Sequence, residues 1–578
     1  MIRALILLCL FSSATISMAA MLRVPLDHPD VNAALAVAQE GDTVAVAASF
    51  SVPGGLQVPG RELALLGGWN DEFTMMTGSS PVNGTTSAPA IHLLSPDTGS
   101  PLVGGFTVTG GVGLELSNPI PGRYGGGILV EGGSPTLQDL TLTGGIAGGN
   151  SDFGGGGGLA LIGTEALVQR VTVTGCRASW GAGILIVGGA AVMQDCMLID
   201  NTCFPLSGGQ VASGAGLAIY RGNLVLEDTE IRGGRGAARG GGLAWLGVRG
   251  RVLEVQRCLF LDNTMELDGG GLFAENGTVT LEDCRFEDNI PAPDAPYTSG
   301  GGAYITGAGA TLVGVVFAQN QANAGGGLTV NTAPQADVQD CVFLANESDF
   351  FGAALNYQSN DTGEVSGNTV AGNMGVAETG VVNLVNFSST LSRNLVAWNA
   401  GGGVALSSGT LMPTCNNVFG NSGSPWIGLA DPTGSDGNFS VDPFFCDLEA
   451  GDLSLRNDSP CLDAPGCGLV GALGEGCGGG VSVGDTPSSL PPVVAFPNPF
   501  NPRVTLRAHL DGGPVRLSIH DVRGRLVRVL VEADRPAGTL EAVWDGRDAR
   551  GRGMSSGVYS YRLETVRGVA TGRLTLLR

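Results

Sequence analysis

A phrase of about 28 residues recurs along most of this 578-residue chain and limits the fold more than any other feature. One copy is DGGGLFAENGTVTLEDCRFEDN, residues 268–289. When the copies of the phrase are aligned on their last residue, eleven intervals separate the first such position, Gly111, from the last, Asn421. A fixed period of this length indicates a solenoid, in which each repeat forms one coil and buries apolar surface against the next.

Each copy contains three short runs in which apolar and polar residues alternate. In residues 271–286 the runs are GLFA, VTL and CRF, and the alternation changes phase at Glu282-Asp283. A period-two pattern that changes phase at a turn indicates strands joined by bends. The repeats show no helical pattern, so the sequence predicts an all-β rod of three-strand coils, stacked in parallel and roughly 50 Å long.

The corners of each coil explain the most regular residues of the phrase. The GGG supplies a tight turn that needs positive φ angles. The final asparagine is expected inside another corner, where its amide bonds to its own turn and to the asparagine of the next coil. The sequence therefore predicts a ladder of amides that serves stability. Its members are Asn201, Asn263, Asn289, Asn320, Asn346, Asn373, Asn399 and Asn421.

Both ends of the rod break the period. PDVNAALAVAQEGDTVAVA, residues 29–47, predicts a short amphipathic helix, a turn and a first strand. Such a helix would cap the first coil and block pairing at its edge. VDPFFCDLEAGDLSLRNDSPCLD, residues 441–463, is expected to close the other end.

These segments resemble known families. NAALAVAQEGDTVAVA is similar to the opening of secreted right-handed parallel β-helix proteins of the pectate-lyase-like kind. The GGGL and F-x-x-N elements resemble the repeats of chlamydial polymorphic outer-membrane proteins, which are surface adhesins. The resemblance implies that residues 20–480 form a right-handed parallel β-helix, which begins with a short N-terminal capping helix. It does not imply one function, because this fold hosts lyases, hydrolases and adhesins.

The last part of the chain has a different composition. Residues 493–578 hold 14 arginines against 8 acidic residues, a net charge of +6, which leaves −29 for the rest of a chain whose total is −23. VSVGDTPSSLPP, residues 481–492, is a Pro/Ser-rich linker. About six or seven short alternating runs follow it, which predicts a small β-sandwich over 493–578.

The segment FPNPFNP with IHDVRGRLVRVL and SGVYSYRL resembles a known module. It is the Ig-like C-terminal domain shared by type IX secretion sorting tails and flagellar hook-capping proteins. Behind a β-helix, the resemblance implies a sorting domain that engages the outer-membrane secretion machinery of a Gram-negative bacterium. Residues 1–19 carry Arg3, a short apolar stretch and Ser17-Met18-Ala19, which predicts a secretory signal peptide. We therefore expect a secreted or cell-surface protein with no transmembrane segment in the mature chain.

Eleven cysteines remain after Cys9 of the signal peptide, and disulfides persist in an exported protein. Cys446, Cys461, Cys467 and Cys477 cluster in sequence and are expected to pair among themselves. Cys176 occupies a ladder position and Cys203 follows the next one closely, so this pair is expected to join adjacent coils. About half of the remaining cysteines are expected to be buried apolar side chains.

Several catalytic constellations are absent from the repeats. The four histidines are His28, His92, His509 and His520, all outside residues 105–423, and the chain has no lysine. A Ser-His-Asp triad or a histidine-bearing zinc site in the repeats is therefore excluded. The side of the strand after GGG that should face outward carries no carboxylate, which argues against a lyase or hydrolase there. Those positions are Leu129, Ala160, Leu185, Ala218, Ala244, Phe273, Tyr304, Thr329, Asn356 and Ala405.

Two sets of residues remain candidates for binding. Phe273 and Tyr304 are expected outward on adjacent coils, either as an aromatic platform for a sugar ring or as a simple stacked pair. Asp200, Asp262 and Asp288 precede ladder positions, and they are either solvated corners or ligands for calcium. The sequence requires no cofactor. The acidic body also argues against nucleic acid as a partner.

The sequence therefore favours a non-catalytic, adhesin-like β-helix that binds a glycan or another cell. One alternative is a polysaccharide lyase or glycoside hydrolase acting on acidic polysaccharide, with its site in the longer loops 203–213 and 289–300. The other is a purely structural surface rod.

Overall fold

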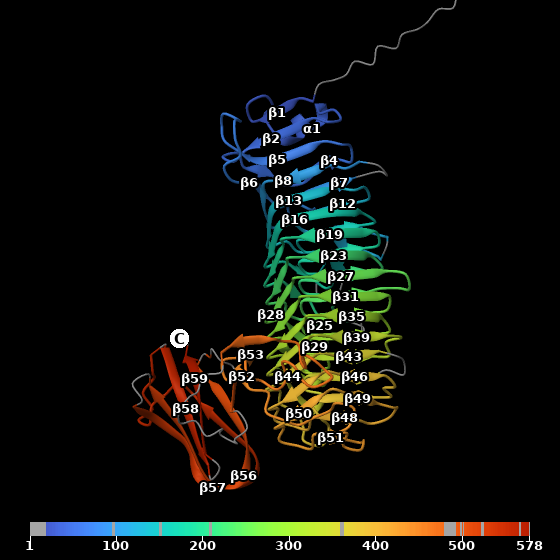
Figure 1. Cartoon of the computed structure of the whole chain (residues 1–578). Helices are drawn as coiled ribbons and strands as arrows, with labels where there is room; N and C mark the ends of the chain where they lie inside the picture. Colours follow the sequence, from blue (N-terminus) through green and yellow to red (C-terminus); the bar gives the residue numbers. More distant parts are fainter. Residues whose placement is uncertain are drawn as a thin grey trace, which may run out of the picture.

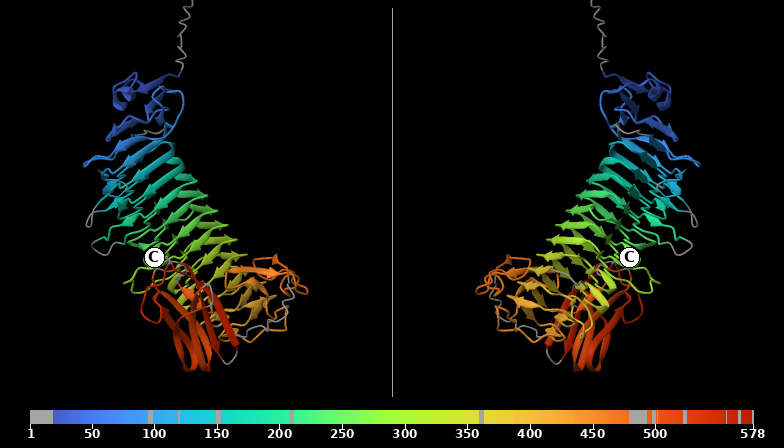
Figure 2. Two further views of the ribbon diagram at one scale, coloured as in Figure 1. Left: turned by 90° about the vertical axis from the view of Figure 1, so that its left-hand side faces the viewer. Right: turned by 90° about the vertical axis from the view of Figure 1, so that its right-hand side faces the viewer.

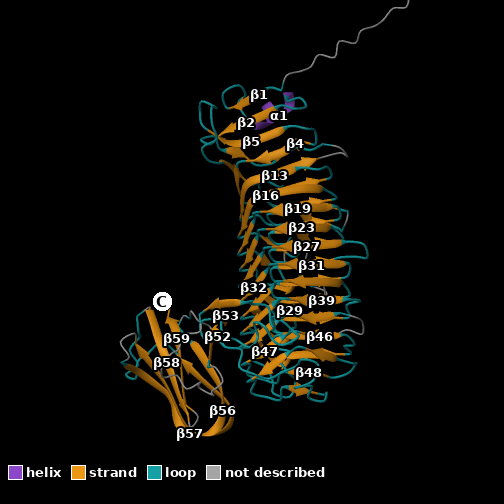
Figure 3. Cartoon of the chain, viewed as in Figure 1, coloured by secondary structure: helices purple, strands orange, loops and turns teal. Residues whose placement is uncertain are grey.

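The computed structural model describes residues 19–94, 99–118, 120–148, 153–206, 211–358, 363–478, 493–496, 500, 502–521, 525–555, 557–565 and 568–576. The expected signal peptide lies outside these residues except for Ala19, and the expected linker 481–492 lies wholly outside them. The described chain forms a right-handed β-helix followed by a small β domain, as the repeat predicts (Figure 1, Figure 3).

One face of the rod is a 14-stranded sheet with one short strand from each coil, or rung. Neighbouring strands are parallel and in register, so that Leu272 pairs with Leu243 on one side and Ala303 on the other. The strands are β4 (Leu56–Pro59), β7 (Ile91–Leu94), β12 (Ile128–Glu131), β15 (Leu159–Ile162), β18 (Ile184–Val187), β22 (Leu217–Tyr220), β26 (Leu243–Leu246), β30 (Leu272–Glu275), β34 (Ala303–Thr306), β38 (Leu328–Asn331), β42 (Leu355–Gln358), β45 (Val382–Val385), β48 (Val404–Leu406) and β51 (Trp426–Ile427).

The other two faces belong to one 27-stranded parallel sheet. They join because β13 (Thr136–Thr143) and β16 (Glu165–Thr174) each run through the bend and pair on both faces. The face that follows the 14-stranded sheet contains β1 (Met21–Val24), β2 (Thr43–Ala47), β5 (Ala64–Trp69), β8 (Leu102–Gly104), β19 (Ala190–Gln194), β23 (Asn223–Glu227), β27 (Val252–Gln256), β31 (Thr278–Glu282), β35 (Gly309–Val313), β39 (Ala336–Gln339), β43 (Glu364–Ser366), β46 (Thr390–Ser392) and β49 (Met412–Thr414). The last face contains β3 (Val52–Pro53), β6 (Ser80–Asn83), β9 (Phe106–Thr109), β20 (Met197–Ile199), β24 (Glu230–Arg232), β28 (Leu259–Leu261), β32 (Arg285–Glu287), β36 (Val316–Ala318), β40 (Val342–Leu344), β44 (Thr369–Ala371), β47 (Leu395–Ala397) and β50 (Asn417–Phe419).

Ten shorter strands lie on one flank of the rod, between the ladder corner and the GGG turn. They form small sheets of two or three strands. They are β10 (Leu114–Leu116), β11 (Gly122–Tyr124), β14 (Gly154–Gly155), β17 (Arg177–Ala178), β21 (Thr202–Cys203), β25 (Ala237–Arg239), β29 (Thr264–Asp268), β33 (Ile290–Pro291), β37 (Gln321–Ala324) and β41 (Glu347–Phe351).

A single hydrophobic core runs along the rod from Val24 to Trp426. Inward side chains of successive rungs stack in columns, as the in-register pairing requires. Phe260, Phe286, Phe317 and Phe343 stack with ring centroids 4.5, 5.1 and 5.1 Å apart. Each rung therefore covers the apolar surface that the previous rung leaves open, which explains why the phrase repeats.

The N-terminal end has the predicted helix and strand. Helix α1 (Val31–Val37) starts at Asp30, whose side chain accepts a hydrogen bond from the Ala33 amide at 2.8 Å. Its buried residues Val31, Ala34 and Leu35 join the core. The sequence did not predict β1. This strand precedes the helix in the chain and pairs with β2, which follows the helix.

The segment after the last rung does not close the rod end as predicted. Its strands β52 (Phe445–Asp447), β53 (Asp452–Arg456) and β54 (Glu475–Cys477) pack against the side of the lower rungs (Figure 1). Leu453 packs beside Val342 and Ala371, and Leu455 lies in one cluster with Leu395. The apolar outer side of β40, β44 and β47 explains this position, because the segment buries it.

Two disulfides hold this segment; one lies within the predicted set of four cysteines and the other departs from it. Cys446 bonds Cys477, but Cys467 bonds Cys415, which belongs to the last rungs, and Cys461 is a buried free thiol. The predicted Cys176–Cys203 bond is wrong, because both side chains are buried free thiols. Cys176 points into the main core, whereas Cys203 lies on the flank in a separate cluster and pairs in register with Ala178.

The C-terminal domain has its own core around Trp544 and five described strands in one sheet, fewer and longer than the predicted six or seven. They are β55 (Val494–Phe496), β56 (Val504–Asp521), β57 (Leu526–Trp544), β58 (Gly557–Thr565) and β59 (Gly568–Leu576). Both views in Figure 2 place the domain beside the last rungs. In the described part of the chain, no helix is long and apolar enough to cross a bilayer.

Candidate functional site

The 14-stranded sheet is buried on both faces, which corrects the expectation of an open outward face. Nine of the ten supposed outward positions are buried, and Tyr304 is half-buried. The flank segment covers the outward side of this sheet. The chain turns sharply at the first glycine of GGG, so the residues that precede the turn lie over the sheet. At Gly269 (φ +67°) a Cβ would lie 2.8 Å from the Phe273 amide nitrogen. Parallel sheets are usually covered in this way on both faces.

Phe273 and Tyr304 do stack on adjacent rungs, with ring centroids 5.7 Å apart and planes 8° from parallel. They do not form an exposed platform, because Phe273 is only 2% exposed. The Arg239 guanidinium lies 5.0 Å from the Phe273 ring, and the Tyr304 hydroxyl accepts a hydrogen bond from the Asn331 amide at 2.8 Å. Of the two interpretations, the structure shows the stacked pair.

The residues just before the GGG turns form a column along the flank. Backbone pairing places them in consecutive rungs in the order Trp180, Ser213, Arg239, Asp268, Ser299, Ala324 and Phe351. Ser213 and Ser299 end the two lengthened loops 203–213 and 289–300. Arg239 and Asp268 therefore lie between the rungs that carry these loops.

Arg239 and Asp268 form a partly buried ion pair, with 3.5 Å between Nε and Oδ2. Burial raises the pKa of the Asp268 carboxyl, and Arg239 offsets part of this rise. Burial, with a smaller contribution from Asp268, also raises the pKa of the Tyr297 phenol. The pair thus brings one protonatable carboxylate next to an exposed aromatic side chain.

Three large aromatic side chains are exposed together on this flank. Tyr297, Phe350 and Phe351 have 49%, 46% and 42% of their surface exposed. The Tyr297 and Phe350 rings lie 6.1 Å apart and 19° from parallel, and Phe350 and Phe351 are 6.4 Å apart. We call these three residues the flank aromatic surface. A cluster of exposed rings of this kind is typical of a binding surface.

A row of polar side chains crosses three rungs beside the flank aromatic surface. Asn323 accepts hydrogen bonds from the Thr298 amide at 2.8 Å and the Thr298 hydroxyl at 3.2 Å. The Asn323 amide donates to Asp349 at 2.8 Å. Thr298 is buried, so only the partly exposed Asn323 and the exposed Asp349, which precedes Phe350, reach the surface from this row. The alternation of the strands did not reveal this site, because its residues lie in loops and flank strands.

The asparagine ladder lies inside the corner, as expected. The Asn289 amide donates to Asn320 Oδ1 at 2.8 Å and to the carbonyl of Phe260 at 3.0 Å. The column is interrupted between Asn201 and Asn263, where Gly234 stands and its amide donates to Asn263 at 3.0 Å. Every ladder side chain except the half-buried Asn421 is at most 1% exposed. These side chains face the inside of the rod and have no surface from which to contact a ligand.

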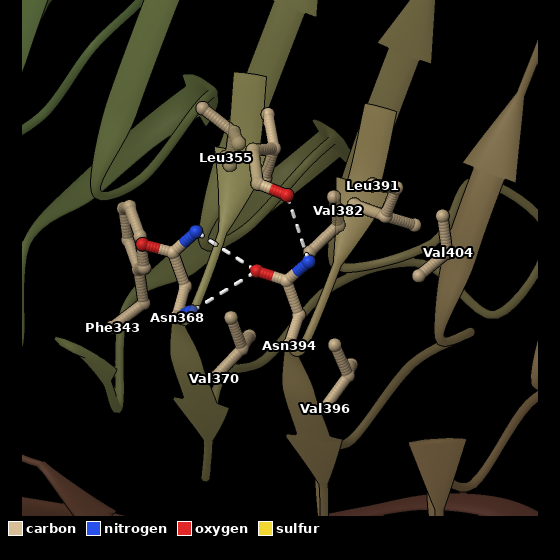
Figure 4. A pocket seen from close by; sticks show the side chains of 10 residues that line it. Phe343, Leu355, Asn368, Val370, Val382, Leu391, Asn394, Val396 and Val404 are labelled. Atoms are coloured by element: carbon tan, nitrogen blue, oxygen red, sulfur yellow. Dashed lines mark hydrogen bonds between the residues drawn. The ribbon is translucent and has the colours of Figure 1, made fainter. Parts of the chain in front are cut away.

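A second ladder, five residues before the first in each rung, was not predicted. Asn368 donates to Asn394 Oδ1 at 2.9 Å (Figure 4). The column continues through Asn416 to Asn438. The same position holds Cys196, Thr229, Cys258, Cys284, Val315 and Cys341 in earlier rungs. Its amides border a small enclosed space lined mostly by apolar side chains, which makes it a structural feature of the core.

Most aspartates at the corners occupy left-handed backbone positions. Asp200, Asp262 and Asp288 have φ angles of 52°, 53° and 53°, a region that aspartate and asparagine enter more readily than most residues. Asp262 and Asp288 are neighbours, and burial with nearby Glu287 and Asp262 raises the pKa of Asp288 to about 6. Asp200 lies two rungs from Asp262, with Gly233 between them. The three carboxylates therefore do not meet, and the described residues contain no group of three potential metal ligands.

The class that these observations define is a right-handed parallel β-helix with an Ig-like C-terminal domain. Residues 105–428, more than half of the chain, match the family model described as right handed beta helix region, so the chain belongs to this family. Residues 503–568 match the FlgD Ig-like domain. No curated protein matches the chain.

Two solved structures are similar over parts of their length. PorZ of Porphyromonas gingivalis, described as an essential bacterial surface component of the type-IX secretion system, is 27% identical over 15% of this chain, with a TM-score of 0.13. The matched part spans only 11% of the PorZ chain. The Dettilon tailspike protein is 10% identical over 94% of this chain and 80% of its own, with a TM-score of 0.28.

Proposed function

We propose that the protein is an exported, non-catalytic β-helix rod that binds a glycan through the flank aromatic surface. The observation that carries this proposal is the joint exposure of Tyr297, Phe350 and Phe351. Aromatic faces stack on the C–H faces of sugar rings, and the neighbouring Asn323 and Asp349 supply groups that bond to hydroxyls. A glycan array probed with the full chain and with Phe350→Ala tests it. Binding that the variant does not weaken would contradict this location.

A polysaccharide lyase or hydrolase is the second candidate. The raised pKa of Asp268, between the rungs that carry the two long loops, is the observation in its favour. A protonated carboxyl next to a substrate serves as a general acid. Incubation of polysaccharides with the wild type and with Asp268→Asn, followed by reducing-end and absorbance assays, separates it from a binder. Release of products by the wild type and not by the variant would establish an enzyme.

A purely structural rod is the remaining alternative. It is supported by the continuous core and the internal asparagine ladders, neither of which needs a ligand. Such a rod would bind no glycan on the array and release no products. Its exposed rings would then contact another copy or the cell surface.

We further propose that the Ig-like domain sorts the protein for export across the outer membrane of a Gram-negative cell. Its likeness to sorting tails and its charge of +6 beside an acidic body support this role. The cut that would release the rod is expected in residues 481–492, which precede the domain. Intact mass spectrometry of the released protein tests the proposal. A mass that includes residues 493–578, or normal export of a chain truncated at Pro492, would contradict it.

A further inference from the structure

The charges around the flank aromatic surface indicate which glycans it accepts. Asp349 directly precedes Phe350, Asp294 stands in the same loop as Tyr297, and Asp268 is close enough to the Tyr297 phenol to perturb it. Asp294 and Asp349 are exposed. The surface is therefore rimmed by carboxylates.

The nearby arginines do not offset this charge. Arg239 is paired with Asp268, and its guanidinium lies over the Phe273 ring. Arg507, from the C-terminal domain, is paired with both Glu347 and Glu541. An acidic sugar needs a free guanidinium or ammonium for its carboxylate, and each of these two side chains already has its partner.

We propose that the flank aromatic surface takes a neutral glycan and discriminates against uronic-acid polymers. This inference rests on the proposed glycan binding and adds the class of sugar. The apolar face of a neutral pyranose lies on the rings of Tyr297 and Phe350, and its hydroxyls exchange hydrogen bonds with Asn323 and Asp349. A uronate in the same place would set its carboxylate against Asp349 and Asp294, while Arg239 and Arg507 are already paired with other carboxylates.

The test is isothermal titration of the full chain with neutral oligosaccharides (cellohexaose, laminarihexaose and xylohexaose) and with hexagalacturonate. We expect at least one neutral sugar to bind, with little dependence on salt. Tyr297→Ala and Phe350→Ala should each weaken binding about tenfold or more. Met412→Ala, which removes an exposed apolar side chain on the last rungs, is the control and should leave affinity unchanged.

Asp349→Asn separates the charge from the hydrogen bonds at this position. It should change the affinity for the neutral sugar less than threefold and should improve the weak affinity for hexagalacturonate. Tight binding of hexagalacturonate that depends on Tyr297 and Phe350 would overturn the inference and leave glycan binding intact. If no sugar binds, or if binding is indifferent to both ring substitutions, the proposed function fails together with it.

Discussion

Arg507 of the C-terminal domain pairs with Glu347, a residue 160 positions earlier at the start of β41 in the rod. The same guanidinium pairs with Glu541 on the neighbouring strand at 3.1 Å and lies 3.3 Å from the Met374 sulfur. Burial raises the pKa of Glu347, and Arg507 opposes this rise. The domain is thus held against the flank at the rungs that also carry Phe350 and Phe351.

Substitution of Arg507 and substitution of Glu347 should weaken the docking of the C-terminal domain to different extents. Arg507→Gln leaves Glu347 partly buried without its cation, whereas Glu347→Gln leaves Arg507 paired with Glu541. We expect docking to weaken by about 1–2 kcal/mol for Arg507→Gln and by less for Glu347→Gln. Hydrogen exchange of peptides covering residues 374–377 and small-angle scattering measure the release. Asp228→Asn, which breaks the Arg257 pair within the rod, is the control and should leave both readouts unchanged.

Asn289→Ala should destabilise the rod by about 1–3 kcal/mol, because it leaves the Phe260 carbonyl and the Asn320 side chain without their partner. Denaturant unfolding measures this change. Asn83→Ala, at an exposed corner, should have little effect. A fully stable Asn289→Ala variant that had lost ligand binding would reverse the structural interpretation of the ladder.

Cys341→Asn should be tolerated, because the next rung already holds Asn368 at the same position. The Cys341 amide donates to Asn368 Oδ1 at 2.9 Å, so a new asparagine would extend the second ladder by one rung. We expect a change in unfolding free energy within about 1 kcal/mol. Cys341→Asp places an unpaired charge in the same buried site and should destabilise strongly. Equal effects of the two substitutions on the denaturation midpoint would argue against the ladder interpretation.

The seven described free thiols are all buried and should resist alkylation in the native protein. For Cys284 this rests on burial alone, because a hydrogen bond with Cys258 lowers the pKa of its thiol. Burial raises the pKa of Cys176 to about 11 and those of Cys203 and Cys341 to about 12, so almost no thiolate is present at neutral pH. Differential alkylation with iodoacetamide before and after unfolding measures this protection. Peptide mapping should also find Cys415–Cys467 and Cys446–Cys477 as disulfides. Labelling of Cys203 under native conditions would contradict the packing of its cluster.

Asp288→Asn should stabilise the protein at neutral pH. The folded pKa of about 6 is above the ordinary value of 3.8, so Asp288 binds its proton more tightly in the folded state. The contribution of Asp288 to folding stability is most favourable below pH 4 and is lost as the pH rises through 6. The gain from asparagine should therefore be about 1 kcal/mol at pH 7, discounted because the side chain is partly exposed, and close to zero at pH 4. Thermal unfolding at both pH values measures it.

Calcium provides a second check at this corner. If a cation joined Asp262 and Asp288, adding calcium at pH 7 would raise the melting temperature of the wild type and not that of Asp288→Asn. We expect no such difference, because Asp262 already pairs with Arg235 at 3.3 Å and Asp200 lies too far along the column to join them.

The period and the alternation of the phrase were enough to predict the rungs, the corner at Asp283 and the ladder through Asn289. They could not reveal the second ladder, because Cys, Thr, Val and Asn share that position and only its lower rungs show a uniform residue. The alternation also placed Phe273 outward correctly but said nothing about what covers it. Its cover comes from the preceding flank segment, whose turn at Gly269 depends on three-dimensional packing.

The flank aromatic surface could not be predicted from the sequence, for a related reason. Tyr297 belongs to an irregular loop, and Phe350 and Phe351 end a flank strand, so they share no periodic position. They meet only because successive rungs stack in register and the loop leans toward the next rungs. The disulfide of Cys467 with Cys415 was missed likewise, since it depends on the closing segment lying along the side of the rod.

The in-register stacking also determines how the rod would respond to a mechanical pull along its axis. Strand-to-strand hydrogen bonds run parallel to that axis, so tension loads them directly. From Phe260 to its stacked neighbour Phe286 the chain travels 26 residues while the rod advances by one strand spacing, about 4.8 Å. A rung that peels away would release about 90 Å of extended chain in exchange for that step. The rod would therefore yield one coil at a time and dissipate work at each release.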